Sequence, residues 1–443
     1  MRTRVVTVLF LVSTAAAAAC FAACSSDGVV QSGSDSGSDT SVDALVPDTG
    51  APVDAGSDVV DASLVTCAVS PCAVAIATGF IHACALMSDE TVRCWGNNAQ
   101  GQLANPIQDG GGGANQFFKP VTIQGIGPVA QIVAGTGHTC VLLKSGDVEC
   151  WGDNQYGQLG EPTDGSASSL TTPVKVALPG KVTQLMSAGF FTCALLTDKT
   201  LSCWGSNSVG QCGVDPGDAG LYAVSMPTTT AGQVHGAIEL GGAWRVACAR
   251  FADGGVSCFG HNANGMLGQG TADSVPHPVA APALIKGAAS HVSRAAGYEG
   301  AVILASGGAQ GWGYNVAGQV GVGTSGTDIT SPTDLPGSST TIDVSPGSNF
   351  GCGLHADGTV WCWGTIAAGQ VGVDPASTDA SFQLAPHQVS GLSNVVQLAS
   401  GWYYFGCALD KGGTVRCWGS DQYAQLGRTA DAGMDFVAAP VVW

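Results

Sequence analysis

The stretch Val148-Glu149-Cys150-Trp151-Gly152, followed by Gly157-Gln158-Leu159-Gly160, decides the fold because its pieces recur along most of the chain. The Trp-Gly dipeptide returns at regular places, and Phe259-Gly260 fills the one gap. The seven aromatic positions are Trp95, Trp151, Trp204, Phe259, Trp312, Trp363 and Trp418, separated by 56, 53, 55, 53, 51 and 55 residues. A fixed period of this length with short apolar runs is typical of four-stranded propeller blades. The sequence therefore predicts an all-β fold, a seven-bladed β-propeller.

The two ends of the repeat region predict how the ring closes. Most repeats open with a Pro-Val-like piece such as Pro120-Val121, but the first repeat enters directly at Val74. The chain ends in Ala439-Pro440-Val441-Val442-Trp443, which is the piece that the first repeat lacks. We expect this C-terminal strand to complete the first blade, because closure removes an open sheet edge.

These pieces together resemble the regulator of chromosome condensation repeat family. The resemblance covers roughly residues 73 to 443 and all seven repeats. It implies a seven-bladed propeller, but no particular activity, because propellers host many unrelated functions.

Twelve cysteines form six pairs, each separated by ten positions in the sequence. Residues ten apart oppose each other in an antiparallel hairpin when the loop has three residues, and the third loop residue is glycine in five of the seven repeats. Opposed strand residues lie close enough for a disulfide. The fifth repeat has Ala301 and Gly311 at both positions, so the cysteines are lost together. The predicted disulfides are Cys84–Cys94, Cys140–Cys150, Cys193–Cys203, Cys248–Cys258, Cys352–Cys362 and Cys407–Cys417.

Three further cysteines lie in the repeat region. Cys67 and Cys72 are expected to form a seventh bridge at the entry to the propeller. Cys212 stands where Leu159 stands in its own repeat, which predicts a buried free thiol. Structural zinc usually takes four ligands from short clusters, a pattern that pairs in separate repeats do not give, so no metal site is predicted.

The N-terminus predicts export. Arg2 and Arg4 precede an apolar run from Val5 to Ala19, and small residues then lead to Cys24, which resembles a bacterial lipoprotein signal. We expect residues 1–24 to be a signal peptide with lipidation at Cys24; Cys20 and ordinary secretory cleavage are the alternatives. Residues 25–66 are rich in Ser, Gly and Asp, which predicts a disordered acidic linker before the propeller at residues 67–443.

Charge and composition exclude some partners. The formal net charge is −18, and only 15 residues are Lys or Arg. Nucleic acids and anionic membrane surfaces bind proteins through such cations, so neither is an expected partner, and membrane attachment is expected only through the lipid anchor. Many cysteines in predicted disulfides indicate an oxidising compartment. We expect a monomer at the outer membrane or cell surface, with a periplasmic or secreted protein as the alternative.

No catalytic motif stands out along the repeats. His82 and His138 precede the first cysteine of their repeats at a position that holds Phe or Val in others, which indicates packing. The other histidines, His291 among them, are scattered without metal or triad spacing, and no Walker loop or Gly-x-Ser-x-Gly element occurs. We therefore expect neither catalytic residues nor a cofactor.

Aromatic residues mark the turns that follow the Ala-x-Gly strands. If these turns project to one face, they form a surface for binding a protein, or alternatively they fold inward over the hub. The residues concerned are Phe80, Phe190, Trp244, Tyr298, Trp402, Tyr403 and Tyr404.

Three functions remain open at this point. The first is an exported, non-enzymatic scaffold that recognises a protein through the aromatic turns. The second is a propeller that binds or cleaves envelope polysaccharide, since aromatic platforms also stack on sugars. The third is a guanine-nucleotide exchange factor-like regulator, which export, acidity and oxidised cysteines oppose.

Overall fold

The computed structural model describes residues 64–108, 114–161, 168–217, 222–230, 234–294, 296–428 and 433–443. All of the described residues belong to one compact unit. The predicted signal peptide, Cys20, Cys24 and the linker up to residue 63 lie outside the described residues. In the described ranges no helix is long and apolar enough to cross a membrane.

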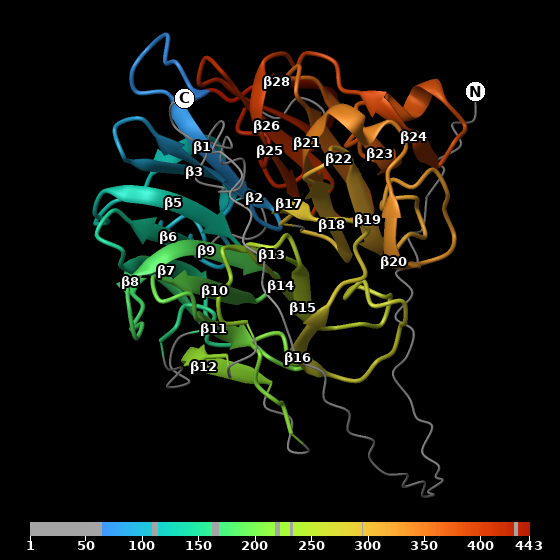
Figure 1. Cartoon of the computed structure of the whole chain (residues 1–443). Helices are drawn as coiled ribbons and strands as arrows, with labels where there is room; N and C mark the ends of the chain where they lie inside the picture. Colours follow the sequence, from blue (N-terminus) through green and yellow to red (C-terminus); the bar gives the residue numbers. More distant parts are fainter. Residues whose placement is uncertain are drawn as a thin grey trace, which may run out of the picture. The chain divides into compact units, whose positions relative to one another are not determined.

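Seven antiparallel sheets of four consecutive strands confirm the predicted seven-bladed propeller. Figure 1 shows the blades following one another in chain order. Blade 1 contains β1 (Ala73–Thr78), β2 (His82–Met87), β3 (Val92–Asn97) and β4 (Gln116–Thr122), and blade 2 contains β5 (Val129–Ala134), β6 (His138–Leu143), β7 (Val148–Asp153) and β8 (Ser169–Lys175). Blade 3 contains β9 (Val182–Ala188), β10 (Phe191–Leu196), β11 (Leu201–Ser206) and β12 (Ala223–Thr229), and blade 4 contains β13 (Glu239–Ala243), β14 (Val246–Arg250), β15 (Val256–Gly260) and β16 (His277–Pro282). Blade 5 contains β17 (Ala289–Val292), β18 (Glu299–Leu304), β19 (Ala309–Gly313) and β20 (Ile329–Asp334). Blade 6 contains β21 (Thr341–Pro346), β22 (Phe350–His355), β23 (Val360–Thr365) and β24 (Phe382–Gln388), with the short 3-10 turn η2 (Ser338–Thr340) before β21 and the turn η3 (Pro375–Ser377) before β24. Blade 7 contains β25 (Val395–Gly401), β26 (Phe405–Asp410), β27 (Val415–Ser420) and β28 (Met434–Pro440).

The prediction that the C-terminal strand completes the first blade is wrong. β28 pairs with β27 of its own blade, and β1 to β4 complete the first blade without help. The Pro-Val-like piece is the last strand of each blade, so the first repeat lacks nothing at its start. The ring closes by packing instead, since β1 contacts β25 and β26 (Figure 1). Trp443 also packs edge-on against Trp95 of the first blade.

The second and third strands of each blade form the predicted hairpin. Their register places the paired cysteines directly opposite each other, as in Cys140↔Cys150, and Ala301↔Gly311 fills that place in blade 5. The structure joins all six predicted pairs by disulfides with Cα–Cα distances of 4.0–4.1 Å, and it also joins Cys67 to Cys72. Thr66 and Ala73, which flank that last bridge, donate backbone hydrogen bonds to Lys411 and Gly413 of blade 7.

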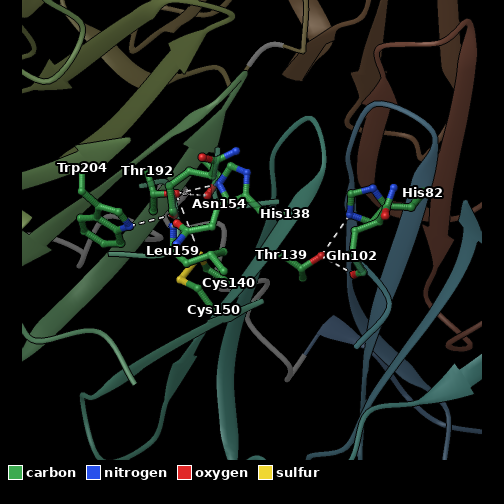
Figure 2. The surroundings of a disulfide bond; sticks show 12 residues. His82, Gln102, His138, Thr139, Cys140, Cys150, Asn154, Leu159, Thr192 and Trp204 are labelled. Atoms are coloured by element: carbon green, nitrogen blue, oxygen red, sulfur yellow. Dashed lines mark hydrogen bonds between the residues drawn. A yellow bond between two sulfur atoms is a disulfide. The ribbon is translucent and has the colours of Figure 1, made fainter. Parts of the chain in front are cut away.

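The repeated Trp-Gly and Gly-Gln-Leu-Gly pieces fasten each blade to the one before it. In six blades the buried indole N–H donates to a backbone carbonyl of the previous blade, as Trp204 does to Gln158 at 2.9 Å. Phe259 is buried at the same place in blade 4 without such a donor. Figure 2 shows this contact around Cys140–Cys150, where the indole of Trp204 points toward the loop that carries Leu159. The Trp-Gly residues therefore pack at the contacts between neighbouring blades.

The third residue of each hairpin loop adopts the left-handed conformation that the glycines predict. Gly254 has φ of 82°, but Lys199 holds the same position in blade 3 with φ of 65°. A lysine in this conformation costs about 1 kcal/mol, and glycine does not. Lys199→Gly should therefore raise the free energy of unfolding by about 1 kcal/mol in urea denaturation. Gly254→Ala is the control and should destabilise, because its new Cβ would lie 2.5 Å from the Cβ of Ala288. A lower midpoint for Lys199→Gly would show that the turn is not strained.

Candidate functional site

The structure brings the predicted aromatic residues to one end of the ring. Each lies in the turn between the first and second strands of its blade, and each side chain is partly exposed. We call these residues the aromatic cap: Phe80, Phe190, Trp244, Tyr298, Trp402, Tyr403 and Tyr404.

The cap is continuous across the axis of the propeller. Trp244 of blade 4 and Trp402 of blade 7 meet with ring centroids 4.1 Å apart. Phe190 and Tyr298 lie against Trp244, and Phe80 lies 6.0 Å from Trp402. Both predicted outcomes therefore apply: the turns share one face, and their central rings close over the hub.

Backbone hydrogen bonds hold the cap residues in place. Trp402 N–H donates to the Gly79 carbonyl, and Tyr403 N–H donates to Phe80, so the turns of blades 7 and 1 are joined. Trp244 N–H donates to the Gly297 carbonyl of blade 5 at 2.9 Å. These bonds reduce the ordering that a partner would otherwise have to impose on the loops.

Three tyrosines that sequence analysis missed extend the cap outward. Tyr156 lies 5.3 Å from Phe190, Tyr314 lies 6.0 Å from Tyr298, and Tyr423 lies 5.2 Å from Tyr403. Each follows the third strand of its blade, beside a turn of the cap. In the sequence, each of these tyrosines lies a few residues after a Trp-Gly position. The repeat period alone does not show that this place lies beside the turn between the first and second strands.

A cavity of about 100 Å³ lies in the hub, with Phe80, Trp244 and Trp402 among its lining residues. We call it the hub cavity. Apolar residues of blades 1, 2 and 7 form much of its wall, and blades 5 and 6 contribute charged residues. Other lining residues include Ile76, Ile132, Val133, Ala134, His291, Arg294, Asp343 and Leu398.

One position of the innermost strand connects neighbouring blades around the hub. In blade 2, for example, Cys140 is the first cysteine of the hairpin, Leu142 lies two residues after it, and Gln131 of the first strand pairs with Leu142. We call the residue at the place of Gln131 in each blade the inner-strand position. Three glutamines there, one each in blades 2, 3 and 7, bond the backbone of the next blade, as Gln131 does with Leu185. In chain order the seven residues are Ala75, Gln131, Gln184, Glu239, His291, Asp343 and Gln397.

Blades 4 to 6 replace these glutamines with an ionic network. The His291 imidazole contacts the buried carboxylate of Glu239 through Nδ1, and its Nε2 lies 3.4 Å from Asp343. Arg250 Nε donates to the other oxygen of Glu239 at 2.5 Å. The sequence does not reveal this role of His291, because Glu239 and Asp343 stand 52 residues to either side of it. Aligning the inner-strand position across the repeats would have revealed the substitution.

The environment of His291 fixes its charge. Burial alone would lower its pKa, but the hydrogen bonds with Asp343 and Glu239 outweigh burial and raise the pKa to about 10. With this pKa, His291 is an imidazolium at neutral pH. Arg294, which also lines the hub cavity, has its pKa lowered to about 9 by burial, opposed by the charge of Asp343.

The two histidines predicted to pack are buried between blades. His82 Nε2 lies 3.0 Å from the Thr139 hydroxyl, and His138 Nε2 lies 2.9 Å from the Thr192 hydroxyl (Figure 2). Burial lowers the pKa of each to about 3, so both are neutral. Their packing role is confirmed. Glu299 takes the same place in blade 5, where burial raises the pKa of its carboxyl well above its usual range.

Cys212 is a buried free thiol, as predicted. Its Sγ lies 3.3 Å from the Ser206 carbonyl oxygen, and burial raises the pKa of the thiol. A protonated, inaccessible sulfur is not a nucleophile. No group of three or more His, Cys, Asp or Glu residues arranged to hold a metal ion occurs within the ranges that the structure describes.

Curated relatives share the repeat along much of this chain. The ultraviolet-B receptor UVR8 of Arabidopsis thaliana is 29% identical over 319 residues, which cover 70% of this chain and 68% of that protein. The E3 ubiquitin-protein ligase HERC2 of Homo sapiens is 27% identical over 296 residues, 65% of this chain but only 6% of its own length.

Solved structures share the fold. Human WBSCR16 superposes with a TM-score of 0.68 at 20% identity, covering 80% of this chain and 95% of its own. Prp20p of Saccharomyces cerevisiae superposes with a TM-score of 0.63 at 17% identity, covering 74% of this chain and 80% of its own.

Models of the regulator of chromosome condensation (RCC1) repeat match five of the seven blades. One model matches residues 73–102, 129–158, 189–211, 342–370 and 395–425, and a second matches residues 89–142 and 145–195. The matched segments contain the cysteine hairpins and the Trp-Gly contacts between blades described above. The repeat matches and the seven four-stranded blades agree, and the chain belongs to the regulator of chromosome condensation (RCC1) repeat family.

Proposed function

We propose that this protein is a non-enzymatic scaffold that recognises a partner protein through the aromatic cap. The observation that carries the proposal is the gathering of seven partly exposed aromatic side chains from five blades around one mouth of the hub. Tryptophan and tyrosine supply much of the energy at protein interfaces, and rigid aromatic anchors lose little entropy on binding. Prp20p, which shares the fold, has binding properties toward Gsp1p and histones.

Blades 4 and 7 present the best anchors. Trp244 and Trp402 pack against each other at the centre with their rings tilted by 34°, where a partner would exclude water from them most completely. The hydrogen bond between the Tyr403 hydroxyl and Gln422, at 3.1 Å, places a polar group at the edge of the same surface. An apolar centre with a polar edge is the usual anatomy of a protein interface.

The scaffold is proposed to act outside the cytosol, anchored through Cys24 and acting as a monomer. The disulfide-joined cysteines support this location, since such bonds persist in oxidising compartments. Differential alkylation of the cysteines tests it, because a chain held in a reducing compartment would carry free thiols.

Capture from the native cell envelope tests the cap. Replacing Trp244 and Trp402 together with alanine should reduce capture of the partner at least thirtyfold, since each central aromatic contributes about 2 kcal/mol or more. Trp361→Ala is the matched control, because Trp361 contacts His355 in blade 6, away from the cap, and capture should persist. Circular dichroism checks that both variants are folded.

Two outcomes would overturn this assignment. Undiminished capture by the double variant would remove the cap from the interface. Capture that survives protease treatment of the envelope extract but is lost after glycosidase treatment would identify a polysaccharide ligand instead of a protein.

A further inference from the structure

The two ends of the propeller carry different charges. Because neighbouring strands are antiparallel, the loops between the third and fourth strands lie at the same end as the turns of the aromatic cap, and we call them the rim loops. In the described parts of the rim loops, Arg428 is the only lysine or arginine. The turns between the first and second strands add Arg245 and Arg294. Carboxyl side chains outnumber these three cations, since the described parts of the rim loops contain Glu161, Asp215, Asp273, Asp328, Asp374, Asp379 and Asp421.

Neutral donors hold two of the rim carboxylates in place. The backbone N–H of Ala376 donates to Asp374 at 2.8 Å, and the side-chain amide of Asn264 donates to Asp328 at 2.9 Å. A hydrogen bond from a neutral donor favours the ionised carboxylate and leaves its charge in place. The guanidinium of Arg428 lies 2.9 Å from a carboxylate of β28, so its charge is already used outside the rim loops.

The opposite end of the propeller holds most of the lysines. Several carboxylates at that end lie beside a lysine, as Glu90 does beside Lys144 and as Asp147 does beside Lys181 at 2.7 Å. The chain has seven lysines, and six of them lie at or beside the hairpins of this end: Lys144, Lys175, Lys181, Lys199, Lys286 and Lys411. The uncompensated negative charge of the described blades is therefore concentrated at the end that carries the aromatic cap.

The aromatic rings of the cap favour the same kind of partner as the carboxylates around them. The faces of tryptophan and tyrosine rings are negatively polarised and attract lysine and arginine side chains. Tyr314 connects the two features, because its ring lies 6.0 Å from that of Tyr298 and its rim loop contains Asp328. Burial and the charge of Asp328 raise the pKa of the Tyr314 hydroxyl, so the field of this carboxylate reaches the edge of the cap.

We infer that the protein bound by the aromatic cap presents a lysine- or arginine-rich segment around an apolar anchor. The inference rests on the proposed function and specifies the chemistry of the partner. The anchor packs against Trp244 and Trp402, and the cations beside it face the rim carboxylates. A surface of one sign steers oppositely charged partners toward it and repels acidic ones, so binding should depend strongly on salt.

Two fluorescent peptides test this charge preference on the full-length protein. Both carry a central tryptophan between leucines, and this anchor is flanked by lysines in one peptide and by glutamates in the other. Fluorescence anisotropy should show the lysine peptide binding about tenfold more tightly than the glutamate peptide, or better. Raising sodium chloride from about 50 to about 300 mM should weaken the lysine peptide about tenfold, because salt screens exposed charges.

A triple variant of the rim loops locates the negative charge. Asp215→Asn, Asp374→Asn and Asp379→Asn together should weaken binding of the lysine peptide about fivefold at about 50 mM sodium chloride. Asparagine accepts the same backbone hydrogen bonds that Asp215 and Asp374 accept, so the loops should keep their conformation.

The matched control removes equal charge from the opposite end. Asp198, Asp253 and Asp357 are exposed in hairpin loops there, and replacing all three with asparagine changes the net charge by the same amount. Affinity for the lysine peptide should stay within about twofold, because these carboxylates lie at the far end of the blades. Circular dichroism checks that both triple variants are folded.

Four results would contradict the inference. Absence of binding by the lysine peptide, or equal affinity for both peptides, would reject a basic partner. Equal effects of the two triple variants would make net charge responsible instead of the rim loops. Undiminished binding of the lysine peptide after Trp244→Ala with Trp402→Ala would place it outside the cap. Envelope capture distinguishes the two proposals: if this tryptophan variant loses capture while the peptides show no charge preference, only the inference fails, whereas persisting capture rejects the proposed function.

Discussion

Reduction of the blade disulfides should unfold this propeller at 37 °C. Each disulfide closes a loop of about ten residues, and chain entropy gives up to about 3 kcal/mol per bond. Six such contributions together exceed the 5–15 kcal/mol by which typical domains are stable. The bonds lie within blades, so each stabilises one hairpin, as Cys140–Cys150 does in blade 2.

A single blade gives the quantitative form of this prediction. Cys140→Ala with Cys150→Ala should lower the free energy of unfolding by about 3 kcal/mol, measured by urea denaturation followed by tryptophan fluorescence. Cys212→Ala is the control for loss of a buried cysteine side chain, because Cys212 forms no disulfide. A double variant as stable as the wild type would show that this bond contributes nothing.

Differential alkylation identifies which cysteines carry these bonds. Cys212 should react only after unfolding, because it is buried and its pKa is raised. The fourteen other cysteines of the described region should react only after reduction. Alkylation of the blade cysteines without reductant would contradict both the disulfides and the proposed oxidising location.

Features that repeat within one hairpin could be predicted from the sequence. The spacing of Cys140 and Cys150, with Gly146 at the third loop position, determines the register, because a glycine must take positive φ there. Packing at the Trp-Gly positions followed from recurrence alone. The aromatic turns could be placed on one end because each follows the same strand of its blade.

Features that depend on contacts between blades could not be predicted in the same way. The Pro-Val-like piece lies between two blades in the sequence, and its pairing with the preceding Trp-Gly strand is a choice that the period leaves open. In the sequence, Glu239, His291 and Asp343 are isolated ionisable residues. They come into contact only because blades 4, 5 and 6 are neighbours in the ring. Glu299 was overlooked because a buried carboxyl replaces Phe or His without changing the pattern around it.

Replacing His291 with glutamine should lower the free energy of unfolding by about 3–5 kcal/mol. The imidazolium of His291 lies between the carboxylates of Glu239 and Asp343. Its removal leaves both carboxylates without this cation, and an uncompensated buried charge is strongly destabilising. Gln131→Ala is the matched control at the same inner-strand position in blade 2. It removes two hydrogen bonds to Leu185 but no charge, and should cost only about 1–3 kcal/mol.

Glutamine at all three positions should recover only part of that loss. The triple variant Glu239→Gln, His291→Gln and Asp343→Gln gives blades 4 to 6 the residue that blades 2, 3 and 7 already carry. It removes both carboxylates together with the imidazolium, but Arg250 and Arg294 keep their charges and lose those carboxylates, and a buried charge without its partner is costly. A triple variant less stable than His291→Gln alone would show that the carboxylates stabilise the ring through these two arginines.

The pH dependence of stability separates a charged His291 from a neutral one. Its folded pKa of about 10 lies above the ordinary value of 6.5, so its contribution is complete below pH 6.5 and is lost as pH rises through about 10. Wild-type stability should therefore fall over this interval, and the triple glutamine variant should lack that part of the slope. If both proteins lose stability equally over this interval, His291 is neutral in the folded protein.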